Sequence, residues 1–338
     1  MSSSVFKADD QIKTVYKGLS HIVILGAGAS IASVYDNPEK TGMQLPSMDN
    51  LVEIVGLESK LNNKISKLNS KNFEVIFSSL YEEDPDSSLV KELEVDVYNY
   101  FDNLSLPDSP TIYDYLVLSL RSKDIIATFN WDPFLWQAYV RNMNFTENLP
   151  KLAFLHGNVA VGVCEEDKSF GPKNEISLIS NKPFLPTKLL YPITKKNYAS
   201  NSYISGQWNL LSQGLEKPAR VTIFGYSAPK SDVEAIKIMK KAYGNPEDQR
   251  FTQFEIIDKK DKDKLADTWG EFIFSHHYEV HTDFFESTIA KFPRRSGEVF
   301  WANFMKAKWW SANKPPRLNS IPELWDWYSR FLPAENIS

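Results

Sequence analysis

Asn130 and His156 are the two side chains best suited, by type and position, to carry out a reaction in this chain of 338 residues. Each stands at the end of an apolar run, DIIATF (124–129) for the asparagine and KLAFLH (151–156) for the histidine. An asparagine amide donates and accepts hydrogen bonds at once, and a histidine exchanges a proton near neutral pH. Both runs are typical of buried parallel strands, whose carboxyl ends meet at one edge of a sheet. We therefore expect a shared catalytic site at that edge; a purely structural histidine is the alternative.

A glycine-rich turn, Gly26-Ala27-Gly28-Ala29-Ser30, follows the apolar run HIVIL (21–25) and precedes a predicted helix. Glycine lets backbone amides approach a pyrophosphate, and the amino end of a helix adds about half a positive charge. Ser30 can add a hydroxyl donor. In the dehydrogenase fingerprint a third glycine would stand at position 31, where this chain has Ile31. The turn therefore predicts contact with a nucleotide without indicating a dehydrogenase. A tight turn with no ligand is the alternative.

Two carboxylates also follow predicted strands. Asp132 lies directly before Pro133, so it can bind a ligand, cap the next helix, or do both. Asp258 follows the run QFEII (253–257), where it can accept hydrogen bonds from both hydroxyls of a ribose. A plain turn into the charged segment KKDKDK is the other interpretation of Asp258.

The run ARVTIF (219–224) leads into a second small-residue turn that contains Gly225 and Ser227. These two residues suit close contact with a phosphate or a ribose. Downstream, Ser231 and Glu234 fit a capping box, which assigns Glu234 a structural role.

Cysteine and histidine usage excludes most metal chemistry. The single cysteine, Cys164, rules out an intramolecular disulfide and every zinc site that needs two thiolates, and we expect it to be a buried or loop thiol. His276, His277 and His281 lie in FSHHYEVH, which reads as an alternating strand without a carboxylate or thiol pattern nearby. We therefore predict no metal site.

Charge and hydropathy restrict the compartment and partners. The formal net charge of −5 and pI near 5.7 give no long-range attraction to phosphate backbones, so direct nucleic-acid binding is disfavoured. The amino terminus lacks a secretory pattern, and apolar runs stay short of the about 18 residues that a membrane span requires. These features favour a reducing, cytoplasmic location without membrane contact.

The elements that position these residues are five short apolar runs, at 21–25, 124–129, 151–156, 219–224 and 253–257, with helical stretches between them. This alternation predicts an α/β fold with a doubly wound, Rossmann-like parallel sheet. The long gap after the first run predicts a helical insertion at 49–120 within a main domain of residues 1–290. Inside it, Asp84 to Ser87 should break the chain, and Ser109 should cap a helix that begins at Pro110. Residues 165–200 read as a loop or lid.

Five of the nine tryptophans fall in the last 38 residues, which predicts a helical C-terminal appendage at 291–338. We expect this segment to pack against the main domain. A partner or self-association surface is the alternative, because tryptophan is enriched at interface hot spots.

Taken in order, GAGAS, TFNWD, LHGN, FGYS and EIID resemble the motifs of the sirtuin family, over residues 21 to 258. The resemblance implies a sirtuin-like Rossmann domain that binds NAD through these motifs. Asn130 and His156 would lie beside the nicotinamide ribose, and Asp132 would meet the carboxamide. The remaining contacts would come from Gly26, Ala27, Gly28 and Ser30 at the pyrophosphate, Gly225 and Ser227 at a phosphate or ribose, and Asp258 at the adenosine ribose.

The departures from the family disfavour a deacylase. Sirtuin deacylases carry a four-cysteine zinc module where this chain has only Cys164, Phe129 replaces a glutamine, and LPSMDNL replaces a proline-aspartate-phenylalanine-arginine loop. The chain looks more like the zinc-free sirtuin-like NAD hydrolases of bacterial antiphage defence. That resemblance implies cleavage of NAD to nicotinamide and ADP-ribose, with NAD as substrate and no further cofactor. Asn130 would position the water, and His156 would act on the ribose hydroxyls or as general base.

The same resemblance implies control of a harmful activity. We expect a homo-oligomer gated by assembly, by a phage component, or by a partner ATPase such as a HerA-like translocase. Two alternatives stay open: a non-catalytic sensor or scaffold that binds NAD or ADP-ribose, and a zinc-free deacylase or ADP-ribosyltransferase.

Overall fold

A computed structural model describes residues 5–34, 44–193, 198, 201–229, 232–249, 251–273 and 277–336. Its centre is a six-stranded sheet in which all neighbouring strands run parallel. The strands, in sheet order, are β10 (Tyr278–His281), β9 (Gln253–Ile257), β8 (Arg220–Phe224), β2 (His21–Leu25), β3 (Ile125–Thr128) and β4 (Lys151–Phe154). β2, β3 and β8 are buried along their whole length. The five predicted runs are thus confirmed as strands, and the segment that contains His281 adds the sixth.

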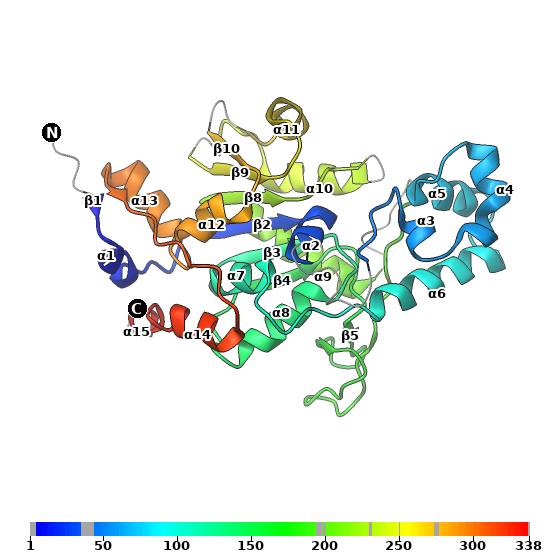
Figure 1. Cartoon of the computed structure of the whole chain (residues 1–338), viewed down its shortest axis with the longest axis horizontal. Helices are drawn as coiled ribbons and strands as arrows, with labels where there is room; N and C mark the ends of the chain where they lie inside the picture. The colour runs from blue at the N-terminus through cyan, green and yellow to red at the C-terminus, as the bar shows by residue number, and fades with distance from the viewer. Residues whose placement is uncertain are drawn as a thin grey trace.

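The strand order makes the sheet doubly wound. Numbered along the chain, the six strands lie in the order 3-2-1-4-5-6 read from β4, the order of dinucleotide-binding folds. The chain passes from β2 outward to β4, returns, and continues from β8 to β10 on the other side of β2. Figure 1 shows α10 (Val233–Tyr243) and α11 (Lys262–Trp269) near β8, β9 and β10, with α7 (Ile112–Leu118) and α8 (Phe134–Met143) near β3 and β4. The predicted α/β fold class is confirmed.

Two further helices complete the layers. α2 (Ala27–Val34) packs against α7, and α9 (Ser202–Leu215) packs against β2, β3, β4 and α10. The direction of winding reverses between β2 and β8, so the carboxyl ends of these two strands flank the topological switch point. Ligands of open α/β sheets bind at such a point.

Four helices between β2 and α7 form a lobe beside the sheet, at the right of Figure 1. They are α3 (Leu51–Ile54), α4 (Glu58–Leu68), α5 (Phe73–Glu83) and α6 (Ser88–Asp102). The predicted break is confirmed, because Ser87 caps α6 by accepting from the Val90 amide at 3.3 Å. The predicted cap at Ser109 is wrong. α7 begins instead at Ile112, where the Asp114 carboxylate accepts from both the amide and the hydroxyl of Thr111 at 2.7 Å.

The helix α7 belongs with the sheet rather than with this lobe, since it packs against α2 and α8. The insertion 49–120 therefore combines a protruding lobe, α3 to α6, with one helix of the layered core. The division of the chain into domains stays a prediction.

Residues 161–186 form a small antiparallel sheet where the sequence suggests mainly loop. Its order is β6 (Phe170–Pro172), β5 (Val161–Val163) and β7 (Leu185–Pro186). The strands are too short to show a clear alternation. Gly162 lets the sheet close, since a Cβ there would lie 2.7 Å from the Phe184 Cβ. Cys164 is a free, buried thiol 3.1 Å from the Ser180 hydroxyl, as expected.

The C-terminal segment packs against the main domain. η3 (Phe284–Glu286) and α12 (Thr288–Lys291) lead into α13 (Ser296–Lys306), β11 (Trp309–Trp310), α14 (Ile321–Ser329) and α15 (Leu332–Glu335). β11 pairs in parallel with β1 (Val5–Phe6), which precedes α1 (Ala8–Lys13). The Trp325 ring stacks on Phe145 at 6.0 Å, and its Nε1 donates to Asn142 Oδ1 at 2.8 Å. Packing is thus the interpretation that the structure bears out for this part of the tail.

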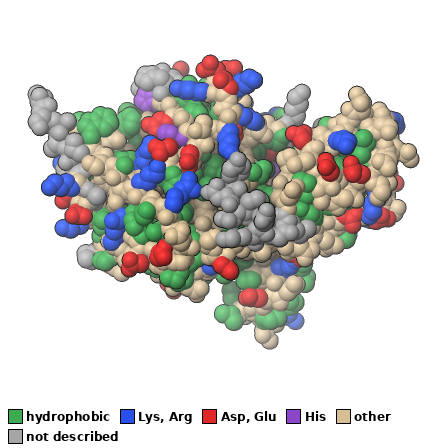
Figure 2. All heavy atoms as spheres, in the orientation of Figure 1, with side chains coloured by type: hydrophobic (Ala, Val, Ile, Leu, Met, Phe, Trp, Pro, Cys, Tyr) green, Lys and Arg blue, Asp and Glu red, His purple; other side chains and the backbone are tan. Residues whose placement is uncertain are grey.

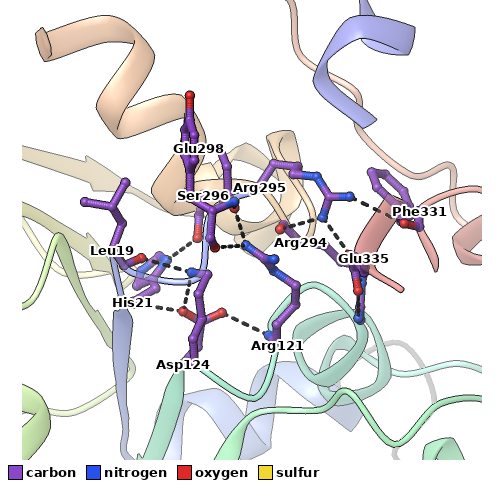
Figure 3. A network of polar contacts seen from close by, with 12 residues as sticks. Leu19, His21, Arg121, Asp124, Arg294, Arg295, Ser296, Glu298, Phe331 and Glu335 are labelled. Atoms are coloured by element: carbon purple, nitrogen blue, oxygen red, sulfur yellow. Dashed lines mark hydrogen bonds and ion pairs between the residues drawn. The ribbon is translucent and has the colours of Figure 1, made fainter. Parts of the chain in front are cut away.

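A buried network of charges fixes this segment to the amino-terminal edge of the sheet (Figure 3). Glu335 of α15 accepts from Arg294 at 2.5 Å and from Arg295 at 2.6 Å, and the Arg121 guanidinium pairs with Glu298. Arg294 and Arg295, which both pair with Glu335, are almost completely buried. Because an unpaired buried charge is costly, each partner is needed by the others. The network lies at the edge opposite the carboxyl ends of the strands.

Two observations concern the charge on the surface and the character of the helices. Figure 2 shows Lys and Arg side chains interspersed with Asp and Glu on the face in view. Among the described helices, none combines the length and apolar character of a membrane span.

Candidate active site

The carboxyl ends of the strands open into a cavity of about 440 Å³ at the switch point between β2 and β8. Nine of the ten site residues predicted from the sequence line it: Gly26, Ala27, Gly28, Asn130, Asp132, His156, Gly225, Ser227 and Asp258. Ser30 does not. Leu45 to Asp49, Asn72, Glu74 and Phe101 line the opposite wall, so the helical lobe closes the cavity against the sheet.

A second cavity of about 330 Å³ adjoins the first. Gly28, Gly225 and Asp258 line both, so the two cavities adjoin at the sheet edge, and we refer to them together as the trench. His156 lies only in the larger cavity, and Asp283 and Arg317 only in the smaller. The predicted residues are therefore ordered along the trench, from His156 at one end to Asp258 near its middle.

The glycines of the first turn hold two strand ends in contact. The Gly28 amide donates to the Gly225 carbonyl at 3.0 Å. A Cβ on Gly26 would lie 2.5 Å from the Tyr226 Cα, and one on Gly225 would lie 2.4 Å from the Ala29 nitrogen. Gly225 also has a φ of 61°, which disfavours other residues. These glycines are thus required for the approach of the two turns, and a pyrophosphate contact by Ala27 or Gly28 stays a prediction.

Ser30 lies behind the cavity wall, fully buried. Its Oγ donates to Asp132 Oδ2 at 2.7 Å and accepts from Asn130 Nδ2 at 2.8 Å. The Tyr113 hydroxyl lies 2.6 Å from the same oxygen. Ser30 therefore links Asn130 to Asp132 in this structure, in place of the exposed pyrophosphate position expected from the sequence.

Asn130 is held by its amide nitrogen. Its Nδ2 donates to the Gly26 carbonyl at 2.8 Å as well as to Ser30. Because an amide nitrogen carries two hydrogens, these two bonds use both, and Oδ1 is the atom left to accept. Asn130 lines the cavity with 8% of its surface exposed. Such a fixed acceptor suits the orientation of a water or a ribose hydroxyl.

Asp132 lines the cavity and also bonds to the start of the next helix. Oδ1 accepts from the Phe134 amide at 3.2 Å, in the first turn of α8, and Oδ2 accepts from Ser30. Its carbonyl accepts from Asn158 Nδ2 at 2.7 Å, which ties the segment after β3 to the segment after β4. Burial raises the pKa of Asp132 to about 6, against the hydrogen bonds from Ser30 and Phe134, which lower it. A buried carboxylate in a cavity, with its pKa near neutrality, is typical of functional sites.

His156 is enclosed by aromatic rings and one carboxylate. Its Nε2 lies 3.3 Å from the Tyr198 hydroxyl and 3.7 Å from Asp232 Oδ1. The His156 and Phe129 rings are T-shaped with centroids 4.9 Å apart, and the Phe129 ring stacks on Tyr226 with centroids 4.1 Å apart. Sequence reasoning identified none of these four neighbours as site residues.

The acid after β9 forms a turn and lines the trench. The Asp258 amide donates to the His281 carbonyl at 3.0 Å, and Oδ1 accepts from the Lys260 amide at 2.9 Å. Ser227 is exposed at the cavity rim. Glu234 pairs with Lys237 at 2.7 Å on α10. Ser231, the partner in the predicted capping box, lies outside the described residues.

The histidines near the end of the sheet are not isolated from carboxylates as the sequence suggested. His281 Nε2 lies 3.4 Å from Glu255 Oε1 and 3.3 Å from Glu279 Oε2, which together raise the pKa of His281 to about 9. Linear sequence concealed the group because Glu255 comes from β9, the parallel neighbour of β10. Glu255 also accepts from the Thr222 hydroxyl and the Thr288 amide. Although the three side chains are close enough to hold a metal ion, these bonds describe an ion-pair cluster.

His277 Nδ1 lies 3.1 Å from Gln253 Nε2, and His276 lies outside the described residues.

Comparisons with known proteins were made for the sequence and for the structure. Neither a family model nor a curated protein matches the sequence. Among solved structures, a Sir2 homologue in complex with NAD is similar at 12% identity, over 89% of this chain and 93% of that chain, with a TM-score of 0.39. A structure concerned with the mechanism and regulation of Sir2 enzymes is similar at 12% identity, over 86% of this chain and 96% of that chain, with a TM-score of 0.39.

Proposed function

We propose that this chain is a sirtuin-like NAD hydrolase that cleaves NAD to nicotinamide and ADP-ribose. The observation that carries the proposal is the convergence of Asn130, Asp132 and His156, from two adjacent strand ends, in one cavity at the switch point of the sheet. The ordered motifs that resemble sirtuins supply the identity of the nucleotide.

The trench supports a dinucleotide in extended form. Its two cavities, about 440 and 330 Å³, fall within the range of about 300–1,000 Å³ that ligand sites occupy. With the nicotinamide beside Asn130 and His156, the adenosine ribose would reach Asp258, where the two cavities join. The glycine turns at Gly28 and Gly225 lie between these ends and would face the pyrophosphate.

Hydrolysis requires a positioned water and an acceptor for one proton. The water oxygen forms a bond to C1′ of the nicotinamide ribose while the C1′–N1 bond breaks, and the bonding pair leaves with nicotinamide. Asn130 Oδ1 accepts a hydrogen bond from this water and orients it. His156 takes the proton that the water loses and passes it to solvent, a contribution of about 10²- to 10⁴-fold in rate.

Asp132 would serve the leaving group and the developing charge. Its carboxylate would accept from the nicotinamide carboxamide, which sets the ring relative to the water. Its negative charge in a buried site also favours the cationic, oxocarbenium-like transition state. The pKa of Asp132, raised by burial to about 6, leaves this carboxyl mostly ionised at neutral pH.

The test is NAD cleavage by the purified chain, followed by chromatography of nicotinamide and ADP-ribose. We expect turnover in the wild type and its loss in Asn130→Ala and His156→Ala. Asn62→Ala and His277→Ala, whose side chains do not line the cavity, are matched controls that should stay active. Undiminished cleavage by both cavity variants would refute the mechanism.

Two further arms of this experiment separate the alternatives. NAD or ADP-ribose binding by calorimetry without turnover, alone or with candidate partners, would replace the hydrolase with a sensor or scaffold. NAD-dependent removal of the acyl group from a labelled acyl-peptide would replace it with a zinc-free deacylase.

We also propose a role in antiphage defence, with gating by self-assembly, a phage component or a partner ATPase. This part rests on the sequence resemblance alone. It predicts that cells carrying the wild-type chain and its partner lose NAD after phage infection, and that cells carrying His156→Ala keep it. Equal NAD levels in the two would contradict the defence role.

A further inference from the structure

Asp232 is a carboxylate of the cavity that lies beside the histidine of the proposed mechanism. Its Oδ1 lies 3.7 Å from His156 Nε2, and its Oδ2 accepts from the Tyr226 hydroxyl at 2.9 Å. Asp232, His156 and Tyr226 are 3%, 5% and 4% exposed. All three line the cavity. The carboxylate therefore shares a largely dry environment with the imidazole.

The position of Asp232 in the chain would ordinarily explain an aspartate without a site. It is the N-cap residue of α10, and aspartate is favoured there because its carboxylate accepts from the first backbone amides of the helix. In this helix the side chain makes no such bond. The carboxylate is directed instead to Tyr226 and His156, so helix capping does not account for its placement.

His156 is one of four side chains that form a closed ring of contacts. Asp232 accepts from the Tyr226 hydroxyl, and the Tyr226 ring stacks on Phe129 with an interplanar angle of 8°. The Phe129 and His156 rings are T-shaped, with an interplanar angle of 81°. The pair of His156 and Asp232 completes the ring. Tyr198 adds a hydroxyl to Nε2 from another loop. The imidazole is thus held on several sides, and Asp232 is the only acid among these neighbours.

We propose that Asp232 is a positioning residue for His156, one that holds the imidazole in place and balances its charge once it has taken a proton. The inference rests on the proposed function. In the hydrolytic step His156 gains one proton from water and becomes a cation. At about 4 Å two unit charges near a protein surface attract by several kcal/mol. A neutral residue at position 232 would remove that attraction for protonated His156. It would have little effect on the position of neutral His156.

The test compares Asp232→Asn with three other variants. Asp232→Asn keeps the shape and removes the charge, so kcat for NAD should fall about 10- to 100-fold while KM changes less than about 3-fold. Asp232→Glu should recover part of kcat. Tyr226→Phe removes the hydroxyl bond to Asp232 and keeps its charge, so it should lose less than about 5-fold. Glu247→Gln, an exposed carboxylate beyond α10, is the matched control and should behave as wild type.

A second readout does not depend on turnover. In ¹⁵N NMR titrations of ligand-free protein, the midpoint for His156 should move to lower pH by about one unit or more in Asp232→Asn, and should stay in place in Glu247→Gln. An unchanged midpoint would overturn the inference. Equal losses of kcat in Tyr226→Phe and Asp232→Asn would also overturn it. The ring of contacts, rather than the negative charge of Asp232, would then account for the loss.

The two hypotheses fail in different ways. A wild-type chain without NAD cleavage refutes the proposed function, and the titration still decides whether Asp232 acts on His156. Cleavage that requires His156 but is indifferent to Asp232→Asn refutes the inference and leaves the hydrolase standing.

Discussion

Asp132→Asn should make the fold more stable while it impairs turnover. The pKa of Asp132, about 6 in the folded chain, lies about two pH units above its ordinary value of 3.8, because the carboxylate is buried. Each pH unit corresponds to about 1.4 kcal/mol, so the ionised carboxylate costs the folded state about 3 kcal/mol at pH 8. The folded chain holds this proton more tightly than the unfolded chain. The contribution of Asp132 to the free energy of unfolding is therefore fully present at low pH. It is lost as the pH rises from about 4 through 6.

An amide of the same shape removes this cost. The Ser30 hydroxyl can rotate to suit it, and the neighbouring Phe134 amide keeps an acceptor. We expect urea denaturation to show a gain of about 2–3 kcal/mol at pH 8, and about 1 kcal/mol at pH 4.5, where the wild-type carboxyl is already protonated in the folded chain. Asp86→Asn, in an exposed turn, should change stability by less than about 0.5 kcal/mol at both pH values.

Asp132→Asn should also cleave NAD more slowly. The carboxylate that destabilises the fold is the group proposed to stabilise the transition state. A loss of stability at pH 8, or a gain that is the same at pH 4.5, would refute the assignment of a strained, ionised carboxylate to this position.

Four other outcomes follow from individual contacts. Ser30→Ala should lower kcat about 10- to 100-fold, the value of one hydrogen bond to a charged group, with little change in KM; a raised KM at constant kcat would indicate pyrophosphate binding instead. Glu335→Gln should lower the free energy of unfolding in urea by about 3–5 kcal/mol, because two buried arginines lose their partner; a change below 1 kcal/mol would contradict this. His281, with its pKa raised to about 9, should stabilise the fold fully below pH 6.5, and this stability should be lost as the pH rises through about 9; thermal melts of His281→Gln should lack that step. Gly225→Ala should cost about 2–4 kcal/mol in denaturant titrations, since its Cβ would clash with the first turn at a positive φ, and a neutral effect would refute the close approach.

The fold was predictable where the sequence contains uninterrupted apolar runs. A strand in a parallel sheet is covered on both faces, so its residues are apolar without alternating with polar ones. HIVIL and ARVTIF could therefore be recognised as strands from their continuous apolar character. Their carboxyl ends then placed Asn130, Asp132 and His156 at one edge. Topology follows from this class of fold, because right-handed crossovers leave few possible strand orders.

What the sequence did not predict depends on contacts between distant segments. The side chain of Ser30 is turned inward by its place on the buried face of α2, which a turn motif does not reveal. Asp232 was not identified from the sequence, because its contacts with Tyr226 and His156 form only in the fold. The cluster at His281 joins two strands that pair only in the folded sheet. The cap of α7 is two residues beyond Ser109, because Thr111 finds its capping partner in Asp114.

The central claim is that the trench cleaves NAD at the nicotinamide–ribose bond. The most direct measurement is a time course of NAD, nicotinamide and ADP-ribose in one reaction with the purified chain, alone and with candidate partners. We predict that nicotinamide and ADP-ribose accumulate in equal amounts as NAD disappears, and that Asn130→Ala and His156→Ala abolish both products. Intact NAD in every wild-type reaction, or cleavage by both variants at the wild-type rate, would contradict this mechanism.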